Sequence, residues 1–143
     1  MSRFAIIDTN IVVAGLITAH ADSPVARILD GMLGAAFGFV VSEALMAEYR
    51  AVLLRPHLCQ RHGLSVAEVD TILTDIARHA IVLTPGGGMA APRAPDPGDQ
   101  FLGDLLLTRH DLVLVTGDKR LLQDETMQQR VIPPPVFAAQ LQH

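Results

Sequence analysis

The sequence has little that could crosslink the chain or anchor it in a membrane. It contains a single cysteine, so no internal disulfide can form and a reducing compartment fits; we expect Cys59 to be a partly buried bystander. Uncharged stretches such as residues 31–42 are far shorter than the ~20 residues that span a bilayer. An acid at position 8 interrupts the first apolar run too early for a signal peptide. We therefore predict a cytoplasmic protein without a membrane segment.

Aromatic residues and positive charge are also scarce. Tryptophan is absent and aromatic side chains make up 4% of the chain, which argues against the stacking platforms that hold single-stranded nucleic acid. The net charge is −4, so strong non-specific binding to nucleic acid is not favoured, although a local basic patch stays open. Half of the 143 residues are hydrophobic, enough for one well-filled core, and we expect a single domain over residues 1–143.

Short apolar runs alternate with stretches of helical periodicity along the chain. The runs predict strands at 4–7, 37–41, 81–83, 112–115 and 131–132. The periodic stretches predict helices at 11–17, 24–33, 42–54, 66–79, 100–110, 119–122 and 135–141, and the Pro- and Gly-rich segment 84–98 predicts a long surface loop. Uniformly apolar strands between helices are typical of a parallel sheet covered on both faces. The sequence therefore predicts a three-layer α/β/α domain with a central, mostly parallel sheet.

Two acids come soon after predicted strands. Asp8 follows the run FAII, and Asp118 follows LVLVTG. Ligands of parallel sheets bind at the carboxyl ends of the strands, so both acids should reach the same edge of the sheet. Both also suit the N-cap position of the helix that comes next, because Asp is a preferred capping residue. The pattern leaves the cap and the functional site open as interpretations.

A third acid lies on a predicted helix, in SEALMAEYRAVLL. At 100° per residue Glu48 falls between Ala44 and Val52 on an apolar stripe, where an unpaired acid is costly. Glu43 lies on the other side of the same helix and is expected to be solvated. An ion pair between Glu48 and Arg55 is the structural alternative to a functional role.

The same test separates the acids of DPGDQFLGDLLLTRHD. Asp99 shares its helix face with Leu102 and Leu106 and should point inward, with an N-cap as its structural alternative. Asp104 falls on the opposite face and should be exposed to solvent. Asp96 precedes a proline and is expected to be a turn residue.

The four inward acids suggest a chemistry if they converge. Carboxylates that lie close together repel one another and raise each other's pKa, so such a cluster needs cations. Mg²⁺ or Mn²⁺ is the natural ligand of an all-oxygen site, and Mg²⁺ usually keeps several of its waters. Such ions orient and activate a water and neutralise phosphoryl charge during in-line displacement. The chemistry suggested for Asp8, Glu48, Asp99 and Asp118 is phosphodiester hydrolysis.

The chain resembles the PIN-domain nucleases, particularly a bacterial group often catalogued as toxins of toxin–antitoxin systems. The matching pieces are FAIIDTNIVVAGL, SEALMAEYRAVL, DPGDQFLGDLL and VLVTGDKRLL, in that order along nearly the whole chain. The resemblance implies that the four acids bind divalent metal and support RNA cleavage. It also implies a cognate antitoxin protein as partner, and it points to a homodimer.

The resemblance also places small polar residues near the metal cluster, at Asn10, Ser42 and Thr116. Roles as caps or turn residues are the alternative for each of them. Relatives often have a further acid directly after the third one, where this chain has Gln100. This departure leaves the four acids intact but bears on the recruitment of a second metal ion.

Other functions fit the pattern less well. A haloacid-dehalogenase-like phosphatase needs a second acid two residues after the first, where this chain has Asn10, and a response-regulator receiver needs acids before Asp8. A non-catalytic PIN-like module that binds RNA or regulates a partner is the main alternative. It would be favoured by a missing acid, but all four are present.

Basic residues on two segments are candidates for contacts with RNA phosphates, which would give affinity with little sequence selectivity. They are Arg55, His57, Arg61 and His62 after the Glu48 helix, and Lys119 and Arg120 beside Asp118. Solvated charges that complement helix ends are the alternative. For a twofold interface, the candidates are an apolar stretch at 32–37 and a stripe on the 66–79 helix.

Overall fold

The computed structural model describes residues 4–85, 94, 97–124 and 130–141. The strands that it contains are all paired in parallel, as a three-stranded sheet in the order β1-β4-β5 and a two-stranded sheet of β2 and β3. A parallel bridge from Ala5 to Phe39 joins β1 to the end of the β2–β3 pair. The strands are β1 (Phe4–Ile7), β2 (Val40–Val41), β3 (Ile81–Val82), β4 (Leu112–Val115) and β5 (Val131–Ile132).

Helices alternate with these strands along the described chain. They are α1 (Thr9–Ile17), α2 (Pro24–Leu33), α3 (Glu43–Leu53), α4 (Pro56–His62), α5 (Val66–His79), α6 (Gln100–Leu107), α7 (Lys119–Gln123) and α8 (Pro134–Gln140). A 3-10 turn, η1 (Pro97–Asp99), leads into α6. Serine side chains start several of the helices: Ser23 accepts a hydrogen bond from the Ala26 N–H, and Ser65 forms a capping box with Glu68.

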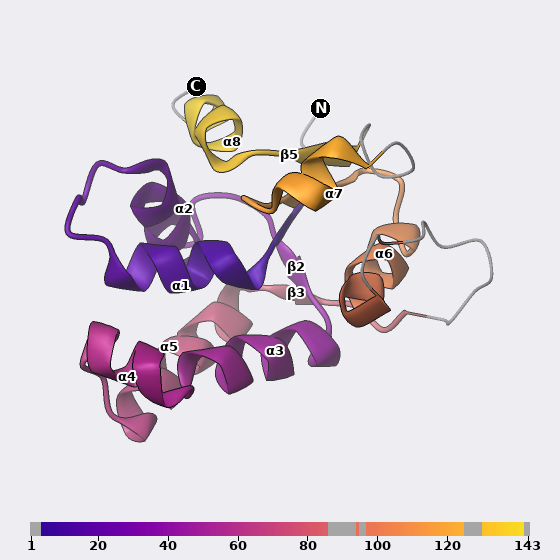
Figure 1. The fold of residues 1–143 in the computed structure, drawn as a ribbon. Coiled ribbons are helices and arrows are strands. Elements are labelled where there is room, and N and C mark those ends of the chain that lie inside the picture. Colours follow the sequence, from indigo (N-terminus) through magenta and orange to yellow (C-terminus); the bar gives the residue numbers. More distant parts are fainter. Residues whose placement is uncertain (1–3, 86–93, 95–96, 125–129, 142–143) are drawn as a thin grey trace.

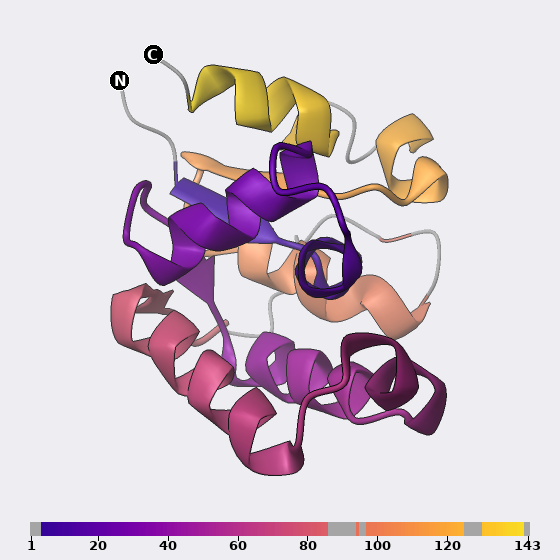
Figure 2. The ribbon, with the colours of Figure 1, turned by 90° about the vertical axis from the view of Figure 1, so that its left-hand side faces the viewer.

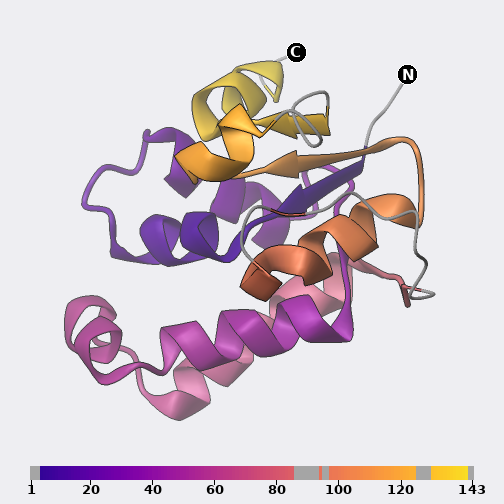
Figure 3. The same ribbon diagram turned by 45° about the vertical axis from the view of Figure 1, so that its right-hand side comes forward.

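The layers are seen from two directions in Figure 1 and Figure 2. Helices α1, α2 and α8 lie on one face of the paired strands β1 and β4, and α6 lies on the other face. Helices α3, α4 and α5 lie together beyond the β2–β3 edge, as Figure 3 also shows. The predicted three-layer α/β/α architecture with a parallel sheet is confirmed.

Most predicted elements are present within a few residues of the predicted bounds. One helix was not predicted: the periodic stretches give no helix between 54 and 66, whereas Pro56–His62 forms α4. The signals were present: Pro56 occupies the first turn, and Gly63 ends the helix with φ 69°, a left-handed conformation that glycine adopts without strain. Most of the predicted 84–98 loop, including Asp96, lies outside the described residues.

Of the two apolar stretches expected at a twofold interface, the stripe on α5 is used inside the protein. The stretch at 32–37 is only partly buried, and Ala35 and Ala36 are exposed. Val69, Leu73 and Ile76 of α5 belong to the core, and Met32 at the end of α2 is fully buried. The α5 stripe is therefore wrong as a candidate interface. It serves instead to pack α5 against α3 and α2.

One buried hydrogen bond ties α3 to the central strand. Tyr49, which is fully buried, donates its hydroxyl hydrogen to the backbone carbonyl of Ile7, the last residue of β1. Burial raises the pKa of Tyr49 well above its ordinary value of 10.0, and the negative charge of Asp8 adds to this shift. The hydroxyl therefore stays protonated and keeps its bond to the strand.

We expect Tyr49→Phe to lower the free energy of unfolding by about 1–3 kcal/mol, because a buried carbonyl loses its donor. A second expectation concerns pH. Since the pKa of Tyr49 is raised in the folded state, its contribution to stability is present below pH 10 and is lost as pH rises further. Denaturant unfolding between pH 8 and 11 measures both the free energy of unfolding that Tyr49→Phe loses and the change of that free energy with pH.

The wild type should lose stability above pH 10 more steeply than Tyr49→Phe, by up to about 1.4 kcal/mol per pH unit for one proton. The comparison is clean because the chain has one tyrosine. Parallel curves for the two proteins would show that Tyr49 does not govern the alkaline transition.

Candidate active site

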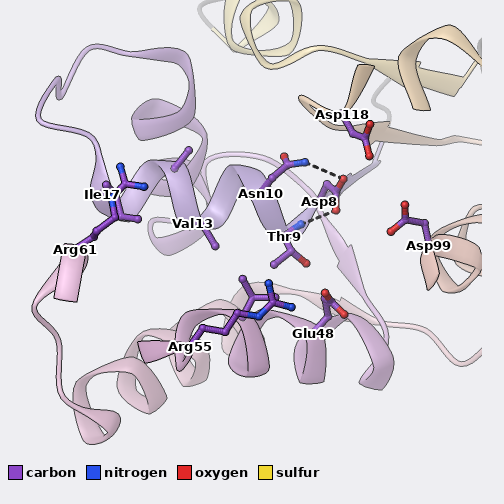
Figure 4. A pocket seen from close by; sticks show the side chains of 12 residues that line it. Asp8, Thr9, Asn10, Val13, Ile17, Glu48, Arg55, Arg61, Asp99 and Asp118 are labelled. Carbon is purple, nitrogen blue, oxygen red and sulfur yellow. Dashed lines mark hydrogen bonds between the residues drawn. The ribbon is translucent and has the colours of Figure 1, made fainter. Parts of the chain in front are cut away.

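A cavity of about 410 Å³ lies where β1 and β4 end. Its walls come from α1, α3 and α4 and from the residues that precede α6 and α7. All four acids predicted from the sequence line this cavity, and each comes from a separate segment (Figure 4). The lining residues are Asp8, Thr9, Asn10, Val13, Ala14, Ile17, Glu48, Val52, Arg55, Arg61, Asp99 and Asp118.

Asp8 is fixed by the sheet and by its neighbours. Its backbone N–H donates to the carbonyl of Val115, which continues the β1–β4 ladder by one residue. One carboxylate oxygen, Oδ1, accepts from the Thr9 N–H at 2.8 Å. The other, Oδ2, accepts from the Thr116 hydroxyl at 2.6 Å and from the Asn10 amide at 3.3 Å. These bonds hold the carboxylate in one orientation.

Thr116 links the two strand-end acids. Its buried hydroxyl donates to Asp8 and accepts from the backbone N–H of Asp118 at 3.0 Å. Asn10 lines the cavity and bonds to Asp8, while the Thr116 hydroxyl stays beneath the carboxylate. Thr116 is thus placed to position acids rather than to meet a substrate.

Both strand-end acids are also helix caps. Asp8 caps α1 through the Thr9 N–H, and Asp118 caps α7 through the Arg120 N–H at 2.9 Å. The sequence left two interpretations open for these acids, a helix cap and a functional site, and the structure is consistent with both at once. The cap uses one oxygen of each carboxylate, and both residues still line the cavity.

Glu48 faces the cavity from α3. Among the described residues no ion pair joins it to Arg55, so the structural alternative is not realised. The buried face of α3 consists of Leu45, Tyr49 and Leu53, so Glu48 lies at its margin rather than inside an apolar stripe. Ala44, expected on that stripe, is exposed.

Asp99 completes the set at the start of α6. It occupies the N-cap position, but its side chain makes no capping hydrogen bond. The prediction for Asp104 was wrong, because its side chain is half-buried and accepts a hydrogen bond from Gln100 at 3.2 Å. Asp104 and Glu43 line a separate, smaller cavity of about 240 Å³, away from the four acids.

Three other predicted residues lie outside the cavity. Ser42 is the N-cap of α3, accepting from the Leu45 N–H at 3.1 Å, and it lines the smaller cavity. Lys119 and Arg120 are exposed on α7 and do not line the cavity; the Arg120 guanidinium lies 3.7 Å from an oxygen of Asp118. The sequence placed these residues near the right acids but could not give their direction.

Sequence reasoning missed other residues of the cavity. Thr9 lies between Asp8 and Asn10, and its position in the DTN tripeptide was the available signal. The aliphatic floor could be found only once α1 and α3 had been packed together. This floor consists of Val13, Ala14, Ile17 and Val52.

Burial raises the pKa of Asp8 above its ordinary value of 3.8, because the charged form loses hydration. The hydrogen bonds from Thr116 and Thr9 stabilise the charged form and oppose this shift. The charges of Asp99 and Asp118 add to it, so both acids lie within electrostatic reach of Asp8. The protein therefore holds Asp8 in a place where ionisation costs free energy.

The residues present suit a hydrated cation. Over the part of the chain that the structure describes, no three His, Cys, Asp or Glu side chains form a group that could hold a metal ion by themselves. Mg²⁺ needs no such group, since it keeps several waters and uses one or two carboxylates directly. The buried hydroxyl oxygen of Thr9 has no hydrogen-bond partner within the described chain, so it is available to a water of hydration. The donor set fits Mg²⁺ or Mn²⁺.

Fold and site together define an α/β protein with an acid-lined cavity at the carboxyl ends of a parallel sheet. A family model described as the PIN domain matches residues 5–120. The chain belongs to the PIN-domain family. No curated protein and no solved structure matches the chain.

Members of this family are generally nucleases and typically bind divalent metals, which supports a nuclease-type fold with hydrolase chemistry here. None of the helices in the described residues has the length and apolar character needed to cross a bilayer.

The pKa of Asp8 predicts how the metal-free protein responds to pH. A raised pKa in the folded state means that folding favours the protonated acid, so stability falls as pH rises from 3.8 through the raised value. We expect Asp8→Asn to remove this loss and to raise the melting temperature at neutral pH in EDTA. The change keeps the shape of the side chain and the acceptor for Thr9, whereas its NH2 group replaces the oxygen that accepts from Thr116 and Asn10. The expected rise therefore requires that the relief of charge exceeds the loss of these two bonds.

Thermal unfolding in EDTA and in Mg²⁺ measures the effect, with Asp22→Asn, on an exposed loop, as the matched control. Mg²⁺ should stabilise the wild type and the control more than Asp8→Asn. An Asp8→Asn protein that melts below the wild type in EDTA would show that Asp8 does not carry unfavourable charge.

Proposed function

We propose that the protein is a divalent-metal-dependent endoribonuclease. The observation that carries the proposal is the convergence of Asp8, Glu48, Asp99 and Asp118 on one cavity in a chain of the PIN-domain family. These acids leave their end of the cavity negative, whereas a phosphodiester is itself an anion. The reacting phosphate can approach the four acids only when cations offset the carboxylates, which supports metal dependence.

The side chains of the site differ in the segments that carry them and therefore in the roles that we assign to them. Asp8 and Asp118 are held rigidly by backbone and side-chain bonds, so they supply fixed negative charge from the sheet. Glu48 and Asp99 enter from α3 and from the start of α6. A bound Mg²⁺ or Mn²⁺ would supply an activated water and neutralise phosphoryl charge. Thr116 and Asn10 orient the oxygen of Asp8 that faces away from Thr9.

Single-stranded RNA should be cleaved in Mg²⁺ or Mn²⁺ and left intact in EDTA. Asp8→Asn and Glu48→Gln should each lower the cleavage rate by about a hundredfold, the upper end of the loss found when a residue that supports a metal site is changed. Gel analysis of a labelled RNA with pure protein measures the rates.

Asp104→Asn is the matched control, because this acid lies in the separate cavity and its loss should leave the rate unchanged. Cleavage in EDTA would rule out the metal-dependent reaction. RNA binding with no cleavage in any divalent metal would favour the alternative, a non-catalytic PIN-like module that binds RNA or regulates a partner.

The resemblance to toxins supports a finer proposal, that this nuclease is the toxin of a toxin–antitoxin pair and is inhibited by a cognate antitoxin protein. An endoribonuclease active on cellular RNA needs such control. The lining of the cavity by both charge signs gives an inhibitor protein defined contacts.

The resemblance also supports a homodimer. With the α5 stripe used in the core, the stretch at 32–37, with Ala35 and Ala36 exposed, stays a candidate interface. The exposed apolar face of α8 is a second candidate; it carries Val136, which is 46% exposed, beside a shallow hollow with Pro135 and Ala139. Light scattering at micromolar concentration should give the mass of a dimer, and Val136→Asp should shift it to a monomer. A wild-type monomer would contradict the assembly, and a dimeric Val136→Asp protein would contradict this face.

A further inference from the structure

The cavity has two chemically different ends. In the close view of Figure 4, Asp99 and Asp118 lie at one end, and Arg61 lies at the other beside Ile17. Arg55 lies between them, along the wall that also holds Glu48. The four acids explain a cation site, but they give no reason for two guanidinium groups in the same cavity.

No carboxylate of the described residues forms an ion pair with the guanidinium of Arg55 or of Arg61. By contrast, Arg50 pairs with Asp70 and Arg109 pairs with Asp111. Arginine carries five N–H donors in a planar fork that matches phosphate oxygens. Two such groups facing one cavity are suited to bind an anion.

The segment that carries Arg61 is held in place from behind. The carbonyl of Leu53, near the end of α3, accepts from the Cys59 thiol and lies 2.8 Å from Nε2 of His62. Nδ1 of His62 accepts from the Leu64 N–H at 2.9 Å, and Leu58 is buried beneath the helix. The predicted role of His62 as an RNA contact is therefore not realised, because its ring fixes α4 instead.

The floor between the two ends is aliphatic. Val13, Ala14 and Ile17 come from α1, and Val52 comes from α3. These four side chains are aliphatic, so they cannot form the aromatic stack that holds a base in many nucleic-acid sites. They can still pack against a ribose or against the open face of an unpaired base. A duplex hides its base faces, so the floor favours an unpaired nucleotide without selecting its identity.

We propose that Arg55 and Arg61 bind a second phosphate of the substrate strand, separated from the reacting phosphate at the acid end by the nucleotide that lies on the aliphatic floor. This subsite rests on the proposed nuclease function. It makes the substrate an extended single strand that contributes at least two phosphates, and it leaves chemistry at the acid end independent of the arginines.

The test compares two substrates that differ in phosphate number. A short RNA oligonucleotide spans both ends of the cavity, whereas a dinucleoside monophosphate has only the reacting phosphate. The double variant Arg55→Gln/Arg61→Gln should lose about tenfold in kcat/KM on the oligonucleotide, mainly through KM, and should lose much less on the dinucleoside monophosphate. Arg78→Gln, on the exposed side of α5, is the matched control.

A second measurement does not need catalysis. In EDTA, fluorescence anisotropy with a labelled oligonucleotide should show weaker binding by the double variant, with a salt dependence flatter by about 0.7 for the one lost phosphate contact on a single strand. Arg61→Gln alone should give about half of that change, and it guards against misfolding of the double variant. Equal melting temperatures would confirm that the folds are intact.

The possible outcomes separate the two proposals. If the wild type cleaves neither substrate in any divalent metal, the nuclease function fails, while the anisotropy experiment still decides the subsite. If the double variant loses equally on both substrates, or binds the oligonucleotide as the wild type does, the second-phosphate subsite is overturned, and the two arginines are left to serve a protein partner.

Discussion

The parallel pairing of β1 with β4 is the constraint on which the site depends. Ile7 pairs with Val115 at the last position of the ladder, and the N–H of Asp8 extends it by one bond. The next residues of the two strands, Asp8 and Thr116, are therefore neighbours, and their side chains meet at 2.6 Å. A slip of the register would move Asp8 away from Thr116, and with it the acid from the cavity.

The rest of the site is added to this pair through a few contacts. Tyr49 fixes α3 to the carbonyl of Ile7, one residue before Asp8, and the next residue back on the helix is Glu48. Thr116 fixes the backbone of Asp118. Burial of apolar side chains in the core stabilises the strands that position the acids, and Ile6 and Leu114 are examples of fully buried strand residues.

Much of this arrangement could be predicted from the sequence, because the strands and helices of this chain differ in the pattern of their apolar residues. The runs FAII and LVLV are uniformly apolar and give β1 and β4 at their observed bounds. Chain order then places Asp8 and Asp118 at one edge of the sheet. Periodicity likewise separated Glu48 from Glu43, since it depends only on the turn of one helix.

Directions between elements could not be predicted in the same way. Whether Ser42 or Lys119 faces the cavity depends on how α3 and α7 are rotated against the sheet, and the local pattern does not contain that rotation. The short helix α4 was hidden for a related reason. Only Leu58 of its seven residues is buried, so it has almost no apolar periodicity, and its boundaries are marked by Pro56 and Gly63 instead.

The separation of charge within the cavity follows from this packing. Carboxylates and guanidinium groups that meet in a cleft normally form ion pairs, and each pair would occupy the ligands that a cation or a phosphate requires. Here the aliphatic side chains of Val13, Ile17 and Val52 lie along the cavity that both sets share. Arg55 and Glu48 are only seven residues apart in the sequence and line the same cavity, but no ion pair joins them in the described structure. A cavity that leaves both charge signs available, and places apolar surface beside them, is suited to a ligand that is itself divided into anionic phosphate and apolar base.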